Sequence, residues 1–185
     1  MFARSMMIAA LALLSGTADA FMRTPMRMGL SVGDKFPSAA LKNFGVAGKP
    51  ACVYFFGADG SPSCTKEAVG FDAALPEFKE LGVSVVGVRN EGGVKEGFAE
   101  EYGQKFVVDE ADLVRNEIGI AKDLFGFLGG RETYLVDSKG EVLFVFNDQF
   151  AADKHATLAL AAAKEALPAK KGGFELPKFE LPSFK

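Results

Sequence analysis

A cysteine that follows a short polar loop is the residue of this sequence best placed to do chemistry. Residues 57–63 read Gly-Ala-Asp-Gly-Ser-Pro-Ser, and Cys64 comes directly after them. Pro62 suits the first turn of a helix, so Cys64 is expected within that turn. The unpaired backbone N–H groups and the positive dipole end there favour a thiolate over a thiol, and the thiolate is the nucleophilic form. The loop therefore predicts a reactive cysteine.

The pattern of apolar residues predicts alternating strands and helices around this cysteine. A short aromatic-rich run predicts a buried strand before the loop, and a β-branched run predicts a second strand after the first helix. Two later runs flank the turn signal at Asp137–Gly140 and predict a hairpin before a closing helix. This order is typical of an α/β sandwich with a mixed sheet. The predicted strands are Ala51–Phe56, Val83–Val88, Thr133–Val136 and Val142–Phe146, and the predicted helices are approximately Thr65–Leu81, Val94–Tyr102, Ala111–Ile118 and Asp153–Leu167.

Composition argues against several classes of protein. The chain has 185 residues, 49% of them hydrophobic, which is typical of one globular domain with extensions. A net charge of −3 argues against binding nucleic acid through its phosphates. Two cysteines and one histidine are too few for a zinc site or a disulfide-stapled scaffold. No apolar run approaches the roughly 20 residues of a membrane-spanning helix, and we expect no metal and no cofactor.

The beginning of the chain has the composition of a targeting sequence. Arg4 precedes an apolar stretch that is too short to span a bilayer, and a small-x-small cleavage site ends at Ala20. We interpret residues 1–20 as a signal peptide and residues 21–30, which are basic and free of acids, as a transit-like segment. A leader whose cleavage exposes Phe21 resembles the bipartite plastid-targeting leader of algae with secondary plastids. Ordinary secretion, or an uncleaved buried helix, are the alternatives.

Residues 168–185 also depart from globular sequence. Phe-Glu-Leu-Pro occurs at Phe174 and again at Phe179, and a period of five residues matches neither a helix nor a strand. Each proline forces the residue before it toward extended geometry. We interpret this segment as an extended tail, which is either disordered or a motif that docks an unknown protein.

The body of the chain, about residues 31–167, contains the segments VGDKFPSAALKNF, SPSCTKEAVGF and GRETYLVDSKGEV. Together these resemble the peroxiredoxin Q group, also called bacterioferritin comigratory protein. The resemblance implies a thioredoxin-like three-layer sandwich with a mixed central sheet. It also implies a thiol peroxidase that reduces hydrogen peroxide and organic hydroperoxides, an antioxidant activity in cell redox homeostasis.

The same resemblance implies roles for four residues. Cys64 matches the peroxidatic cysteine, and Arg131 matches the arginine that stabilises its thiolate and the departing peroxide oxygen. Ser61 matches a hydroxyl residue that hydrogen-bonds the peroxide, and Glu67 matches the acid that supports the arginine. These residue types suit the chemistry, because a thiolate attacks one oxygen while negative charge builds on the other. A guanidinium fork and a hydroxyl can stabilise that charge.

Two positions depart from the family pattern. Gly57 stands where a proline is found seven residues before the cysteine, which we expect to loosen the loop. Val69 stands where many members carry a resolving cysteine. Cys52, which we interpret as a small buried apolar side chain, is roughly 13 Å from the end of its strand, whereas a disulfide needs Cα atoms about 5.5 Å apart. We therefore predict a one-cysteine mechanism in a monomer, with thioredoxin, glutaredoxin or glutathione as external electron donor.

Other interpretations of the same layout fit less well. A thioredoxin-type oxidoreductase uses Cys-x-x-Cys and a cis-proline facing the site, but Ser61 stands in place of the first cysteine, and no proline occurs between Pro76 and Pro168. Enzymes like glutathione peroxidase typically use an active-site tryptophan, and this chain has none. A non-catalytic or weakly catalytic redox sensor or holdase on the same fold is the alternative function.

Overall fold

A mixed five-stranded sheet lies at the centre of the computed structural model, which describes residues 29–122 and 129–167. The strand order is β3-β2-β1-β4-β5, so β1 is the central strand. It pairs in parallel with β2 and antiparallel with β4. The strands are β1 (Ala51–Phe56), β2 (Ser84–Asn90), β3 (Lys105–Asp109), β4 (Glu132–Val136) and β5 (Val142–Asn147), and the helices are α1 (Ser38–Asn43), α2 (Pro62–Glu80), α3 (Leu113–Ile118) and α4 (Ala152–Ala166).

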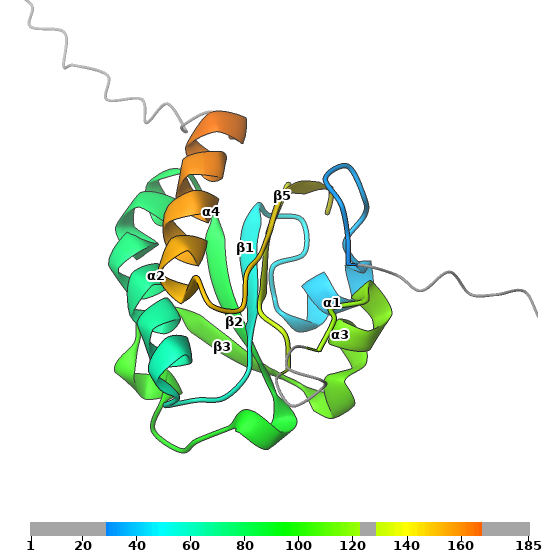
Figure 1. Ribbon diagram of the computed structural model, residues 1–185. Coiled ribbons are helices and arrows are strands. Elements are labelled where there is room, and N and C mark those ends of the chain that lie inside the picture. Colours follow the sequence, from blue (N-terminus) through cyan, green and yellow to red (C-terminus); the bar gives the residue numbers. More distant parts are fainter. Residues whose placement is uncertain (1–28, 123–128, 168–185) are drawn as a thin grey trace, which may run out of the picture.

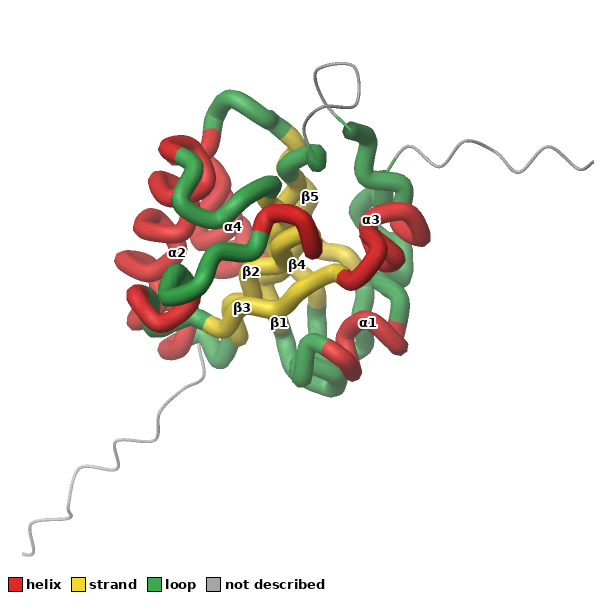
Figure 2. The backbone as a smooth tube through the Cα atoms, turned by 90° about the horizontal axis from the view of Figure 1, so that it is seen from below, coloured by secondary structure: helices red, strands yellow, loops and turns green. Residues whose placement is uncertain are grey.

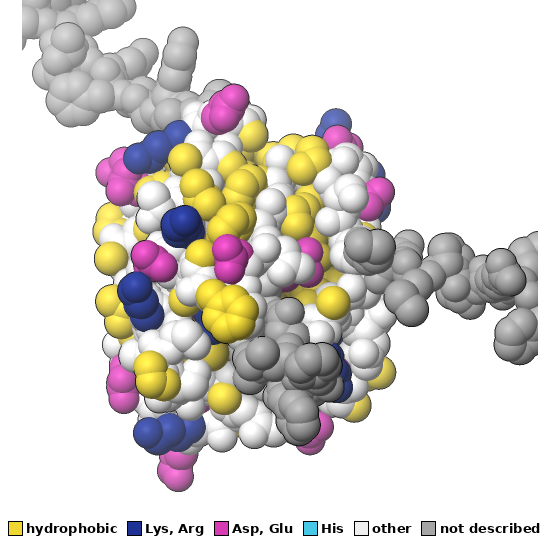
Figure 3. All heavy atoms as spheres, viewed as in Figure 1, with side chains coloured by type: hydrophobic (Ala, Val, Ile, Leu, Met, Phe, Trp, Pro, Cys, Tyr) yellow, Lys and Arg dark blue, Asp and Glu magenta, His cyan; other side chains and the backbone are white. Residues whose placement is uncertain are grey.

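Helices cover both faces of this sheet (Figures 1 and 2). The long helices α2 and α4 pack against each other on one face, and α1 and α3 lie on the other. The outward sides of α2 and α4 carry basic and acidic side chains side by side (Figure 3), and an exposed ion pair of 3.6 Å between Lys66 and Asp153 joins the two helices. This arrangement confirms the predicted α/β sandwich of three layers with a mixed sheet.

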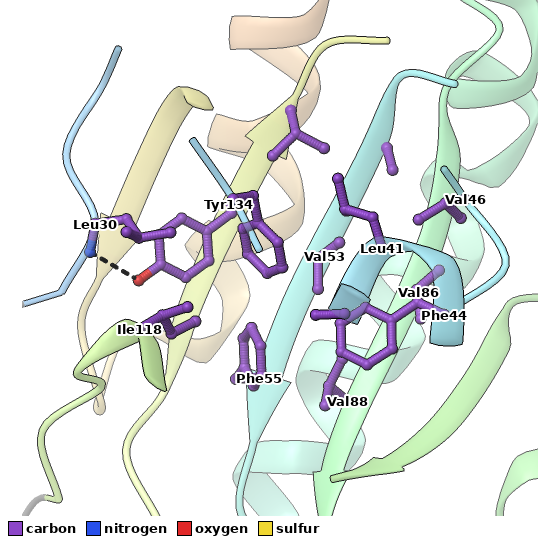
Figure 4. Close-up of a cluster of buried hydrophobic side chains, with 14 of the residues drawn as sticks. Leu30, Leu41, Phe44, Val46, Val53, Phe55, Val86, Val88, Ile118 and Tyr134 are labelled. Atoms are coloured by element: carbon purple, nitrogen blue, oxygen red, sulfur yellow. Dashed lines mark hydrogen bonds between the residues drawn. The ribbon is translucent and has the colours of Figure 1, made fainter. Parts of the chain in front are cut away.

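Strand β1 is buried along its whole length because it is covered on both faces. Successive side chains of a strand point to opposite sides, so Phe55 contributes to the core on the α1 side and Tyr54 to the core on the α2 side. On the α1 side the rings of Phe55 and Tyr134 pack edge to face, and the Tyr134 hydroxyl accepts a hydrogen bond from the backbone N–H of Leu30 (Figure 4). Two cores therefore fix the strand that leads into the cysteine loop.

The predicted helix at Val94–Tyr102 is wrong. This segment contains only a single 3₁₀ turn at Ala99–Glu101, because Gly97 takes a positive φ of 82° that an α-helix cannot accommodate. The next predicted helix starts two residues late, at Leu113, because Ala111 and the residue after it also have positive φ. The helix after the cysteine loop begins at Pro62, so Cys64 lies in its first turn as predicted.

The apolar pattern also misses two elements, α1 and β3. Helix α1 has six residues, too few to show a helical period. Strand β3 is at the edge of the sheet, begins with Lys105 and ends with Asp109, and only its last residue is fully buried. Short, edge-located elements carry weak sequence signals because little of their surface is apolar.

Two parts of the predicted domain plan lie outside the described residues. These are the leader, up to residue 28, and the tail at residues 168–185. Within the part of the chain that the structure describes, no helix is both long enough and apolar enough to cross a bilayer. The same residues contain no group of three or more His, Cys, Asp or Glu side chains that could hold a metal ion.

Candidate active site

The topology of the sheet brings the two ends of the predicted site together. The loop after β1 leads to Cys64, and Arg131 directly precedes β4. Because β1 and β4 are antiparallel neighbours, with Phe55 opposite Glu132, the end of β1 lies beside the start of β4. A separation of 67 residues in the sequence therefore closes to 3.4 Å between Arg131 Nη2 and Cys64 Sγ.

Cys64 is almost fully buried, with 4% of its surface exposed. Burial raises the pKa of its thiol, but a hydrogen bond from the Ser61 hydroxyl, backbone hydrogen bonds from Ala58 and Gly57 and the charge of Arg131 together lower it below the ordinary value. Ser61 precedes the helix at the N-cap position yet makes no capping hydrogen bond, so its hydroxyl is free to face the sulfur. The site therefore favours the thiolate.

The guanidinium of Arg131 is buried and uses its donors in four directions. Its Nη2 donates to Ser63 Oγ at 3.1 Å as well as to Cys64, its Nη1 donates to Glu67 Oε2, and its Nε donates to the backbone carbonyl of Gln149 at 3.2 Å. Only a planar fork can satisfy acceptors placed in this way. The geometry therefore holds one positive charge in a fixed position beside the sulfur.

Glu67 lies one helical turn after Cys64 on the face of α2 that packs against the sheet, and its carboxyl is fully buried. Burial raises its pKa to about 8, the charge on Cys64 adds to the rise, and Arg131 opposes it. Its Oε2 contacts Arg131 Nη1. Its Oε1 has no hydrogen-bond partner among the described residues.

The loop before the cysteine is held by Asp59, which sequence reasoning did not single out. Asp59 Oδ2 accepts hydrogen bonds from Arg89 Nη1 at 2.5 Å and from the backbone N–H of Lys95 at 2.9 Å, and its own N–H donates to the Gly93 carbonyl. The loop is therefore tied to the segment that follows β2. These contacts restrain the loop in which we expect Gly57 to add freedom.

Arg115 is a second buried arginine that sequence reasoning missed. Its Nη1 donates to the carbonyls of Gly129 and Gly130 at 2.7 and 3.0 Å, and its Nη2 donates to those of Phe56 and Val88 at 2.5 and 3.0 Å. These carbonyls belong to the end of β1, to β2, and to the two residues just before Arg131. Gly130 itself must be glycine, because its φ is +72° and a Cβ would lie 2.2 Å from the Ala121 carbonyl oxygen.

We predict that Arg115→Met lowers the free energy of unfolding by about 3–5 kcal/mol, because it removes a charged donor from four buried or partly buried carbonyls. Denaturant titration followed by circular dichroism measures the change. Asn116→Met, at the exposed neighbouring position, is the matched control and is expected to change stability by less than about 0.5 kcal/mol. Equal stability of the two variants would contradict the role of Arg115 as a clamp.

A protein-family model matches most of the folded body, including the assembled site. The model of the AhpC/TSA family matches residues 32–145. The chain belongs to the AhpC/TSA family. The match includes every predicted site residue, Ser61, Cys64, Glu67 and Arg131, and ends within β5.

Curated relatives of this AhpC/TSA family chain carry the name peroxiredoxin Q. The chloroplastic peroxiredoxin Q of Sedum lineare is 44% identical over 111 residues, which cover 58% of this chain and 60% of that protein. The chloroplastic peroxiredoxin Q of Populus jackii is 42% identical over 111 residues, which cover 58% of this chain and 52% of that protein. The chain thus spans between about half and three fifths of the length of these relatives.

Solved structures of the same kind share the fold. Peroxidoxin BcpB from Mycobacterium tuberculosis is 29% identical, with a TM-score of 0.62 over 74% of this chain and 98% of that chain. Peroxiredoxin Q from Xanthomonas campestris is 26% identical, with a TM-score of 0.57 over 65% of this chain and 80% of that chain. These likenesses confirm the thioredoxin-like fold expected from the resemblance.

The second cysteine of the AhpC/TSA domain lies in the core, where its thiolate form is disfavoured. Cys52 is fully buried in β1, paired with Val85 of β2 on one side and Leu135 of β4 on the other. Burial raises the pKa of its thiol, and the charge of Glu67 raises it further. Cys52 and Cys64 are both free thiols. Cys52 therefore has the environment of a structural residue.

Sequence reasoning about the AhpC/TSA domain assigned no role to His155, the single histidine of the chain. It lies on the buried side of α4, where Thr133 Oγ1 and its Nδ1 are 2.8 Å apart. Burial lowers its pKa to about 4, and the charge of Arg131 contributes to the fall. A lone histidine at an apolar helix position is a weak signal, because such residues more often fill a core than serve a site.

Proposed function

We propose that this protein is a thiol peroxidase that reduces hydrogen peroxide and organic hydroperoxides through Cys64. The observation that carries the proposal is the contact between Cys64 Sγ and the fixed guanidinium of Arg131 at the start of α2. A sulfur with a lowered pKa beside a buried cation is the arrangement that nucleophilic attack on a peroxide requires. The names of the curated relatives support the same activity.

The proposed reaction is a displacement at oxygen. The Cys64 thiolate attacks one peroxide oxygen, an S–O bond forms, and the O–O bond breaks. The sulfur is oxidised to a sulfenic acid, and the leaving oxygen takes a proton to become water or an alcohol. Arg131 Nη2 and the Ser61 hydroxyl are the donors available to the oxygen that gains negative charge. An external thiol then reduces the sulfenic acid through a mixed disulfide and a second thiol.

Peroxide consumption with an added thiol tests this function. The full-length protein is incubated with hydrogen peroxide or an organic hydroperoxide and with thioredoxin, glutaredoxin or glutathione in separate reactions. We expect catalytic turnover with at least one of the three donors. Consumption no faster than that of the Cys64→Ser protein with all three donors would reject the peroxidase in favour of a redox sensor or holdase, which the names of the relatives do not favour.

We predict that the protein works without an internal disulfide. The resolving position is occupied by Val69, whose surface is 51% exposed on α2, and Cys52 is locked in the middle of the sheet. One equivalent of peroxide should therefore leave a sulfenic acid on Cys64, and excess peroxide should carry it to sulfinic acid and inactivate the enzyme. Mass spectrometry of the intact protein distinguishes these products.

Val69→Cys is the complementary variant for this prediction. If the first turns of α2 unwind locally, the added thiol should form an internal disulfide and protect against overoxidation. Val69→Ser, at the same exposed position, controls for the substitution itself. A dominant Cys52–Cys64 disulfide in the unmodified protein would overturn the one-cysteine mechanism.

We further propose a plastid location and the following chain plan. Residues 1–20 act as a signal peptide, residues 21–30 as a transit-like segment, residues 31–167 as the peroxidase domain and residues 168–185 as an extended tail. The chloroplastic names of the relatives support the plastid rather than secretion. The protein acts as a monomer, and its tail is available to dock another protein.

A further inference from the structure

A buried pair of titratable groups, Glu67 and His155, lies behind the arginine of the site. Glu67 Oε1 and His155 Nδ1 are 3.5 Å apart, and both side chains are fully buried. Figure 3 accordingly shows no histidine atom on the face that it presents. Glu67 Oε2 is already paired with Arg131, so Oε1 is the free end of the carboxyl. The proposed function gives neither atom a task.

The hydrogen bonds of His155 determine which of its nitrogens carries hydrogen. Nε2 lies 2.9 Å from the backbone carbonyl of Asp148, and a carbonyl can only accept, so Nε2 is an N–H donor. In the neutral ring, Nδ1 then carries a lone pair, which the Thr133 hydroxyl meets at 2.8 Å. The same hydroxyl can accept from Nδ1 if the ring becomes an imidazolium. Thr133 therefore fits either protonation state of His155.

The free carboxyl oxygen lacks a partner when the pair carries no extra proton. In that state the Thr133 hydroxyl meets the Nδ1 lone pair, and the buried Oε1 of an ionised Glu67 has no hydrogen-bond donor among the described residues. One added proton offsets this buried negative charge wherever it resides, because a protonated Glu67 with neutral His155 and an ionised Glu67 with imidazolium have the same total charge. Burial raises the pKa of Glu67 and lowers that of His155, which favours the first form.

Groups from every neighbouring element act on this pair. Arg131 and Thr133 face it from β4, Cys64 from the same helix as Glu67, and the Asp148 carbonyl and carboxylate from the loop before α4. The charge of Arg115 reaches Glu67 as a minor contribution. From β5 the uncharged ring of Phe146 contacts His155, at 4.7 Å between ring centroids, and from β1 Tyr54 and Cys52 are neutral because burial raises their pKa values.

We propose that Glu67 and His155 share one proton while Cys64 is a thiolate, and that His155 is thereby a positioning residue for the charge of Arg131. When the pair is neutral, the positive charge of Arg131 is balanced by the thiolate alone. If the pair loses its proton, the carboxylate takes that charge and the thiolate becomes an uncompensated buried anion. The proposal rests on the proposed function only in taking Cys64 as the reacting thiol.

The coupling between the Cys64 thiolate and the shared proton has a definite sign, which a titration of His155 measures. Because the thiolate stabilises the proton on the pair, the Cys64→Ser protein should release that proton at lower pH than the reduced unmodified protein. The chain has one histidine, so the ring nitrogens in a ¹⁵N-labelled full-length protein are assigned without ambiguity. The Nδ1 chemical shift reports loss of the shared proton as the pH is raised. We expect the apparent pKa of this step to be about one unit lower in Cys64→Ser. Identical alkaline titrations of the two proteins would overturn the proposal.

Two substitutions of His155 test whether it acts through the shared proton or only by filling space in the core. His155→Gln can keep the hydrogen bond to the Asp148 carbonyl but places nothing at Nδ1, and His155→Asn places a permanent amide near Nδ1. Both should let Glu67 ionise more easily, raise the pKa of Cys64 and reduce the thiolate fraction at neutral pH about tenfold. The pH dependence of iodoacetamide alkylation measures this fraction. Lys154→Asn, exposed on the same helix, is the matched control and should titrate like the unmodified protein.

Repeating His155→Asn in the Glu67→Gln protein tests whether His155 acts on Cys64 through Glu67. A glutamine has the charge of the protonated pair at every pH, so His155→Asn should no longer change the Cys64 titration there. An undiminished effect in that background would show that His155 acts by another route. Alkylation does not depend on peroxide turnover, so a failed peroxidase assay with the expected titrations would reject the proposed function and leave this inference standing. If the His155 variants do not fold, the Cys64→Ser comparison still decides it.

Discussion

Cys64→Ser is expected to abolish peroxide consumption, whereas substitution of Cys52 leaves most of it. The sulfur of Cys64 is held as a nucleophile by Arg131 and by the first turn of α2, and a serine hydroxyl in that place does not become an anion near neutral pH. The rate of peroxide loss at saturating thiol donor measures the effect. Equal loss of activity in folded variants of both cysteines would contradict the assignment.

The choice of substitution at Cys52 matters for this comparison. Cys52 is fully buried between two neighbouring strands, and a serine there would bury a hydroxyl at a cost of about 1–3 kcal/mol. Cys52→Ala removes the thiol without adding a polar group, so it is the better matched control. Circular dichroism before and after the assay shows whether each variant remains folded.

Arg131→Lys is expected to slow the reaction of Cys64 with peroxide by about 30- to 900-fold, which corresponds to about 2–4 kcal/mol of transition-state stabilisation. Lysine keeps the charge but cannot meet Cys64, Ser63, Glu67 and the Gln149 carbonyl at once, as the guanidinium does. The second-order rate constant of the reduced protein with one equivalent of peroxide measures the loss.

The same variant should shift the titration of the sulfur. The charge of Arg131 lowers the pKa of Cys64, so a less well placed cation lets that pKa rise, and the acidic limb of the pH–rate profile moves to higher pH. Alkylation by iodoacetamide as a function of pH follows this shift independently of peroxide. A variant with the unmodified rate constant and an unmoved titration would remove Arg131 from the mechanism.

Local patterns in the sequence were sufficient for the parts of the site that a few adjacent residues create. The strand Ala51–Phe56 is found with the predicted bounds, because a continuous apolar, aromatic run is stable only where both faces are covered. Pro62 starts the next helix and places Cys64 in its first turn. Two elements show the limit of local patterns. The edge strand β3 is missed because little of it is buried, and the predicted helix at Val94–Tyr102 does not form because Gly97 has a positive φ.

The charges around the sulfur depend on pairings that no local pattern contains. Arg131 reaches Cys64 because β4 runs antiparallel to β1 in one register, and a shift by one residue would turn the side chains of β4 to the opposite face. Arg115 becomes a clamp only when the ends of β1, β2 and the segment before β4 converge on it. From the residues alone, Arg115 is indistinguishable from an exposed helical arginine.

The sequence thus determined the identity of the nucleophile, the strand and helix that present it and, through family resemblance, the residue types around it. Tertiary structure alone decided the protonation chemistry. Whether Glu67 holds a proton, and whether His155 shares it, depends on how completely water is excluded and on which charges lie within a few ångströms. Desolvation and Coulomb interactions act through space, across α2, β4 and α4, and distance along the chain carries no information about them.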